Sequence, residues 1–230
     1  METTQRVIHR NGLFSKFLLV LVGLAVLLLC YTVVRENLPQ RLTREWPWKL
    51  KLLDLQSATA AVLATGGASL ARAQYARAVR PAIGYFGRVI DGMAPNGRLA
   101  WACHLFNGGP DVAVTAHLSY WVTYTSSAKA RDGATDSSDW MTHQAAVDSM
   151  EGRALLSRRD FALDLIGPGR PIPGEQLMFL SWFTEEAMTE VENVFVRVRV
   201  VDRVGDTHER IINLLKGANR APSQPDPLPF

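Results

Sequence analysis

The sequence is poor in cysteine and lacks the short motifs that identify common catalytic sites. Its 230 residues include two cysteines, Cys30 and Cys103, which excludes a disulfide-stabilised scaffold. It contains no G-x-S-x-G, G-x-x-x-x-G-K-[ST], H-E-x-x-H or C-x-x-C, the patterns of hydrolases, nucleotide-binding loops, zinc peptidases and redox sites. We therefore predict no catalytic residue, no resident metal and no cofactor, and we expect that the protein is not an enzyme.

Repeats and biased composition are absent as well. The chain is 47% hydrophobic and 20% charged, and its 17 glycines follow no period. A disordered chain cannot bury a core of that size, and collagen-like sequences need a regular glycine repeat. The composition indicates one folded domain with an appendage.

Charge is divided unevenly along the chain. Residues 1–80 contain 11 Lys and Arg against 4 Asp and Glu, whereas residues 81–230 contain 14 against 18. The basic character therefore belongs to the N-terminal third, and the remainder is mildly acidic. This distribution argues against nucleic acid as a partner.

A long hydrophobic run near the N-terminus predicts a transmembrane helix. Residues 17–34 read FLLVLVGLAVLLLCYTVV and contain no charge. A helix of that length rises about 27 Å, close to the thickness of the hydrocarbon core. The run is longer than a signal-peptide core and no A-x-A cleavage site follows it, so we expect an uncleaved anchor. Lipidation at Cys30 is a minor alternative.

The flanks of this run predict its contacts with the membrane surface. Residues 1–16 form a basic tail, whose Lys16 can extend toward the headgroups. Trp46 and Trp48 are expected to anchor in the interface. A single-pass protein of the bacterial inner membrane is predicted, with the tail inside and the C-terminal domain in the periplasm. The basic residues after the run also leave a cytoplasmic domain open.

Residues 35–80 are interpreted as a helical connector. Residues 48–64 and 68–80 have helical spacing, Gly66-Gly67 interrupts them, and Arg80-Pro81 ends the second piece. The apolar stripe can pack on the domain, on the membrane or on a second copy, which would make a homo-oligomer.

Residues 81–216 predict a β-sandwich domain. Clear strand patterns cover residues 98–106, 115–125, 194–200 and 207–215, and Asn107-Gly108-Gly109-Pro110-Asp111 predicts a hairpin turn between the first two. Weaker strands are expected within 82–90, 153–166 and 177–183, and 184–193 is a short helix or loop. About seven short strands predict a mainly β, immunoglobulin-like antiparallel sandwich. The Pro-rich tail, 217–230, is expected to be disordered.

Several of these features occur together in a known kind of protein. The chain combines a span with Arg80-Pro81, Leu105-Phe106-Asn107-Gly108 followed by Ala113, and Val198-Arg199-Val200-Val201-Asp202 followed by Gly205. In this it resembles a group of uncharacterised bacterial single-pass membrane-anchored β-sandwich proteins, over about residues 60–215. The resemblance implies the fold and no activity.

Two histidines give the sharpest alternative to a non-enzymatic function. His104 and His117 are predicted on adjacent strands with outward side chains, so they could face each other across a hairpin. An envelope metal-handling protein or enzyme would use them. No carboxylate at ligand spacing joins them, and Cys103 is predicted to be a buried hydrophobe.

Outward aromatic and basic side chains predict where the domain binds. Trp121, Phe195, Arg197 and Arg199 are expected on solvent-facing sides of strands, and such residues are enriched at protein interfaces. We expect a membrane-tethered protein-interaction module, an accessory or assembly component of a bacterial membrane complex. Its partners would be the bilayer and a membrane or periplasmic protein. A lipid- or envelope-contacting structural module is the alternative.

Overall fold

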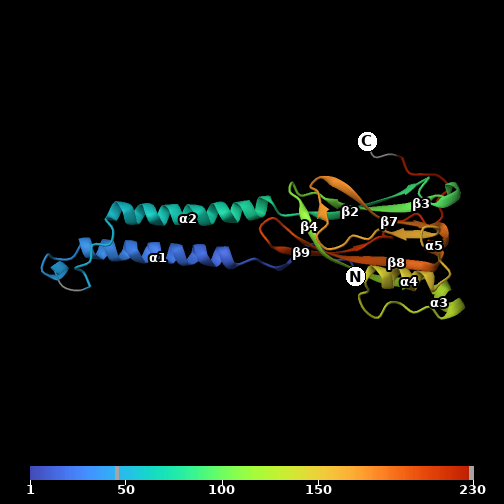
Figure 1. The fold of residues 1–230 in the computed structure, drawn as a ribbon, viewed down its shortest axis with the longest axis horizontal. Coiled ribbons are helices and arrows are strands. Elements are labelled where there is room, and N and C mark those ends of the chain that lie inside the picture. The colour runs from blue at the N-terminus through green and yellow to red at the C-terminus, as the bar shows by residue number, and fades with distance from the viewer. Residues whose placement is uncertain (45–46, 228–230) are drawn as a thin grey trace. The chain divides into compact units, whose positions relative to one another are not determined.

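The computed structural model divides the chain into two compact units and describes residues 1–44 and 47–227. The β unit comprises Met1–Arg10 and Val79–Phe230, and the helical unit comprises Asn11–Ala78. The elements, shown in Figure 1, are β1 (Arg6–His9), α1 (Leu13–Glu36), the 3₁₀ helix η1 (Leu42–Arg44), α2 (Leu55–Ala78), β2 (Ile83–Ile90), the 3₁₀ helix η2 (Pro95–Gly97), β3 (Ala100–Asn107), β4 (Ala113–Tyr124), α3 (Ser126–Asp132), α4 (His143–Glu151), β5 (Phe161–Leu163), β6 (Pro171–Ile172), β7 (Gln176–Thr184), α5 (Glu185–Glu190), β8 (Val191–Val201) and β9 (Thr207–Asn213).

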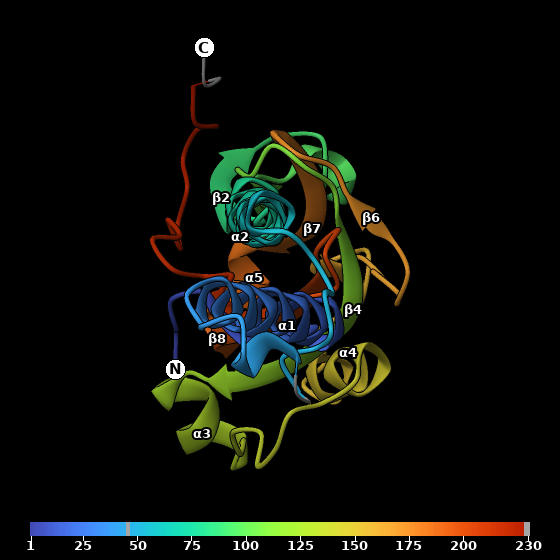
Figure 2. The same cartoon turned by 90° about the vertical axis from the view of Figure 1, so that its left-hand side faces the viewer.

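Two antiparallel sheets form the β unit. One has the strand order β1-β9-β8-β4-β6, and the other has the order β2-β3-β7-β5. In the end-on view of Figure 2, β2 and β7 lie together, and β8 lies away from them. The predicted hairpin between residues 98–106 and 115–125 is wrong, because β3 and β4 belong to different sheets. The turn after Asn107 therefore carries the chain from one sheet to the other.

Both sheets contribute to one hydrophobic core. The alternation of residues 194–200 is confirmed, since the four valines of β8 at even positions are buried. They share the core with Leu105 of β3 and Leu180 of β7. The Trp101 indole donates to the carbonyl of Leu214 at 2.8 Å, so this polar group is satisfied inside the core.

The N-terminal tail supplies a strand, which the sequence analysis missed. β1 pairs antiparallel with β9, and Arg6 lies opposite Glu209. The Gln5 side chain accepts from the backbone N–H of Ile83 at 2.7 Å and donates to the carbonyl of Pro81 at 2.6 Å. The first ten residues thus fold with the β unit, although the chain between Arg10 and Val79 belongs to the helical unit.

The helical unit consists of two 24-residue helices that pack against each other. α1 is long and apolar enough to cross a membrane. α2 starts at Leu55 rather than at Trp48, because the Asp54 carboxylate accepts from the N–H of Ser57 at 2.8 Å and caps the helix. It continues through Gly66-Gly67, so the predicted interruption is wrong.

Two further features of the β unit lie outside the predicted strands. The polar stretch after β4 contains α3 and is followed by α4, because Thr125 and Thr142 cap them. The C-terminal segment, through residue 227, is not a free tail. The Arg220 guanidinium donates to the carbonyls of Met188 and Val191, and Asp226 exchanges hydrogen bonds with the backbone of Val89.

Asn107 holds the crossover between the sheets together. Its buried amide oxygen accepts from the N–H groups of Ala82 and Gly109, and its amide nitrogen donates to the carbonyls of Asp111 and Ile172. The side chain therefore satisfies four backbone groups around the turn. A Cβ at Gly109 would lie 2.6 Å from the carbonyl oxygen of Arg80, so this turn also requires glycine.

We expect Asn107→Ala to lower the free energy of unfolding by about 2–4 kcal/mol, because buried backbone groups lose their partners. Gln176→Ala is the matched control, since Gln176 lies opposite Asn107 on β7 but is exposed. Thermal unfolding of the full chain in detergent, followed by near-ultraviolet circular dichroism, measures both. Equal stability of the two variants would contradict the role of Asn107.

Candidate protein-interaction surface

The structure brings the four predicted interface residues together on one face of the five-stranded sheet. Trp121 on β4 lies directly opposite Phe195 on β8, and Arg197 and Arg199 follow on the same face of β8. Each of the four side chains is half-buried. We call these residues together with Trp140 the aromatic–arginine face.

Trp140 is the member of this face that sequence reasoning missed. The backbone of the next residue, Met141, pairs with Tyr120 of β4 through two hydrogen bonds of 2.8 and 2.9 Å. This pairing brings the Trp140 ring to 6.0 Å from the Trp121 ring, edge to face. Trp140 lies in a loop without strand alternation, so its only sequence signal was a large aromatic residue in a polar stretch.

Arg197 stacks on Trp140. Its guanidinium carbon lies 3.9 Å from the ring centroid, which is a close cation–π contact. Burial lowers the pKa of Arg197, although the guanidinium remains charged at neutral pH. No carboxylate forms an ion pair with Arg197 within the described part of the chain. This face thus holds a fixed positive charge against the ring of Trp140.

Arg199 differs from Arg197 because it is already paired. Its Nε donates to Glu209 at 2.7 Å, and Arg6 of β1 donates to the other oxygen of the same carboxylate, also at 2.7 Å. Burial opposes the ionisation of Glu209, but the two guanidinium groups outweigh burial and hold its pKa below the ordinary value. Glu209 therefore ties the edge strand β1 to the centre of the sheet.

The two histidines of the metal alternative are not brought together. His104 lies on β3, whereas His117 lies on β4 of the other sheet. His104 instead packs edge to face on Phe179, with ring centroids 5.7 Å apart. Across residues 1–44 and 47–227, no group of three His, Cys, Asp or Glu side chains could hold a metal ion.

Cys103 is a buried side chain of the core. Its thiol donates to the carbonyl of Leu214 at 2.8 Å. Burial raises the pKa of this thiol to about 12, so the nucleophilic thiolate does not form at neutral pH.

Two of the predicted membrane-surface residues, Lys16 and Trp48, lie at opposite ends of α1. Lys16 is exposed in its first turns. Trp48 stacks on Tyr31 with ring centroids 5.3 Å apart, and its carbonyl accepts from Arg35 at 2.9 Å. Trp46 lies outside the described residues.

A charged hollow of about 600 Å³ was not predicted from the sequence. Four arginines line it, namely Arg98, Arg131, Arg153 and Arg159. Each forms an ion pair with a carboxylate. Arg98 and Arg159 pair with Asp160, and Arg131 and Arg153 pair with Glu190. Glu186 also pairs with Arg98, and Asp132 pairs with Arg131 and Arg153. Four carboxylates thus balance the four guanidinium groups, which supports a structural role.

The Glu209 pair predicts a pH dependence of stability. A lowered carboxyl pKa stabilises the fold above the unfolded value of about 4.3, and that stabilisation is lost as pH falls through the folded value. We expect acidification from about pH 6 to about pH 3 to lower the melting temperature of the native chain more than that of Glu209→Gln. An equal decrease in both proteins would show that Glu209 does not hold β1.

Comparisons with known proteins do not assign the chain to a family. No protein-family model matches the sequence, and no curated protein matches it.

Proposed function

We propose that the protein is a non-enzymatic, membrane-tethered interaction module. α1 holds it in the bacterial inner membrane, and the β unit, an immunoglobulin-like β-sandwich on the periplasmic side, binds another protein of a membrane complex. The observation that carries the proposal is the convergence of Trp121, Trp140, Phe195 and Arg197 on one sheet face.

The chemistry of the aromatic–arginine face favours a protein partner with an acidic surface. Tryptophan and arginine dominate the binding energy of many protein interfaces. The Arg197 guanidinium has no ion-pair partner among residues 1–44 and 47–227, and the Trp140 ring covers one of its sides. A carboxylate of the partner would pair with Arg197, and apolar groups beside that carboxylate would pack on the aromatic rings.

Membrane tethering explains how a small face can suffice. An anchored domain meets a membrane-bound partner at a high effective concentration, so a modest affinity gives substantial occupancy. The membrane-surface arrangement of Tyr31, Trp48 and Arg35 at one end of α1 supports insertion of that helix. The alternative of a metal-handling protein has no comparable support, because His104 and His117 lie on different sheets.

We expect Trp121→Ala and Arg197→Glu each to reduce partner cross-linking at least about tenfold, the loss expected for a central interface residue. A photo-reactive amino acid at exposed His117, on the same face of β4, reports the contact in native membranes. The adduct is identified by mass spectrometry.

Two substitutions elsewhere serve as controls. Leu165→Ala removes an apolar side chain that is 65% exposed, and Arg203→Glu reverses a charge on the β8–β9 turn. Both should leave the adduct unchanged. If no adduct forms at His117, or if the controls reduce it as much as Trp121→Ala does, the aromatic–arginine face is not the binding surface.

A further inference from the structure

The N-terminal strand restricts how often the chain can cross a membrane. β1 and β9 pair in one sheet. Ahead of β1 in the chain, Thr3 donates its N–H to the carbonyl of Ile211 at 3.2 Å, and Glu2 pairs with Lys216 at 2.7 Å. The two chain segments that form the β unit, Met1–Arg10 and Val79–Phe230, must therefore lie on the same side of the bilayer. A chain that leaves the β unit at Arg10 and returns at Val79 can only cross an even number of times.

We propose that α2 is a second membrane-spanning segment, which returns the chain beside α1. The inference rests on the proposed membrane insertion of α1. It replaces the single crossing expected from the sequence by a two-helix hairpin, whose partner is the lipid bilayer.

The charge-free parts of the two helices match in length and position. α1 has no charge over residues 17–34, and α2 has none over residues 55–71. Seventeen residues rise about 26 Å, within the range of a membrane-spanning helix. The guanidinium carbon of Arg72, at the end of this stretch, lies 5.8 Å from the centroid of the Phe14 ring at the start of α1. The helices therefore run antiparallel, and their charged boundaries coincide.

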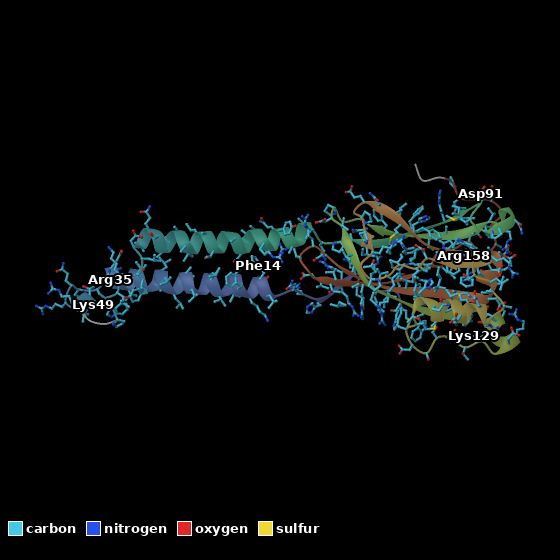
Figure 3. The ribbon with its side chains drawn as sticks, in the orientation of Figure 1. Phe14, Arg35, Lys49, Asp91, Lys129 and Arg158 are labelled. Carbon is cyan, nitrogen blue, oxygen red and sulfur yellow. The ribbon has the colours of Figure 1, made fainter. Side chains whose placement is uncertain are left out.

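The opposite end of the hairpin has a second shared boundary. Arg35 directly follows the charge-free stretch of α1, and Asp54 directly precedes that of α2. Figure 3 shows Arg35 and Lys49 together at one end of α1, and Phe14 at the other. The connecting residues are tied to α1, since the Tyr31 hydroxyl donates to the carbonyls of Pro47 and Leu50 at 2.7 and 2.9 Å. This order of charged, aromatic and apolar layers matches that of a bilayer.

α2 is less hydrophobic than α1 because its contact surface is made of small residues. Ala58 is fully buried, and residues 61, 62, 65 and 69 are partly buried at helical spacing. Helices in membranes associate through such small residues rather than through large apolar ones. The face away from this seam contains Leu63 and Leu70, which are 70% and 61% exposed. Lipid is the occupant that fits this apolar face.

Three hydroxyl groups within the charge-free stretch of α2 do not oppose membrane burial. Thr59, Thr65 and Ser69 each donate to the carbonyl four residues earlier, at 2.8 to 2.9 Å. These hydrogen bonds satisfy the hydroxyls within the helix, as the bilayer interior requires. With the β unit in the periplasm, the loop with Arg41, Arg44, Lys49 and Lys51 faces the cytoplasm, where short basic loops are retained.

Cysteine accessibility in the full-length protein tests the hairpin. Three variants that each add one cysteine, Thr4→Cys, Gln40→Cys and Ser138→Cys, are made in a Cys30→Ser background, and all three positions are exposed. Right-side-out and inverted membrane vesicles are treated with a membrane-impermeant maleimide. Labelling after detergent solubilisation gives the reference for each thiol, and the native Cys103 is buried.

We expect the thiols of Thr4→Cys and Ser138→Cys to be labelled in one vesicle orientation and the thiol of Gln40→Cys in the other. Labelling of the Thr4→Cys and Ser138→Cys variants from opposite sides would overturn the hairpin and restore a single crossing. Labelling of all three variants from one side would also overturn it.

Carbonate washing of the same vesicles separates the two proposals. Release of the protein would contradict membrane insertion itself. A retained protein with the wrong labelling contradicts only the second crossing.

Discussion

The structure depends on the pairing of the N-terminal strand with the last strand of the sheet. β1 covers the edge of β9, which would otherwise present unpaired backbone groups. Glu209 reinforces this edge, because its carboxylate accepts from Arg6 on β1 and from Arg199 on β8. Along the sequence, the whole helical unit lies between two segments that this pairing joins in one folded body. The fold of the β unit therefore constrains any path of the chain through a membrane.

This arrangement connects the aromatic–arginine face to the tail. Glu209 occupies Arg199 and Arg6, which leaves Arg197 as the cation that stacks on Trp140 without a carboxylate among the described residues. β8 is central in this sheet, so its side chains have fixed positions on a rigid surface. A rigid face reduces the entropy lost on binding. The interaction surface proposed here thus depends on interior β structure rather than on mobile loops.

The sequence predicted most strands because local alternation reports burial. The alternating valines of β8 and the pattern of β4 identified the outward Trp121, Phe195, Arg197 and Arg199, which the structure places on one face. The pairing between strands was not predictable, because alternation of buried and exposed residues does not show which strands lie side by side. His104 and His117 were therefore assigned to one hairpin, although the Asn107 turn joins two sheets. β1 was missed because a strand of four residues is too short to show an alternating pattern.

The pairing of tail and domain is tested most directly by zero-length cross-linking of the native protein. A carbodiimide joins a lysine to a carboxylate only where they touch, and Lys216 lies 2.7 Å from Glu2. Lys129 and Asp136, 2.8 Å apart within the β unit, provide the internal standard. The account predicts that mass spectrometry finds both linked peptides. Recovery of the Lys129–Asp136 link without the Glu2–Lys216 link would contradict it.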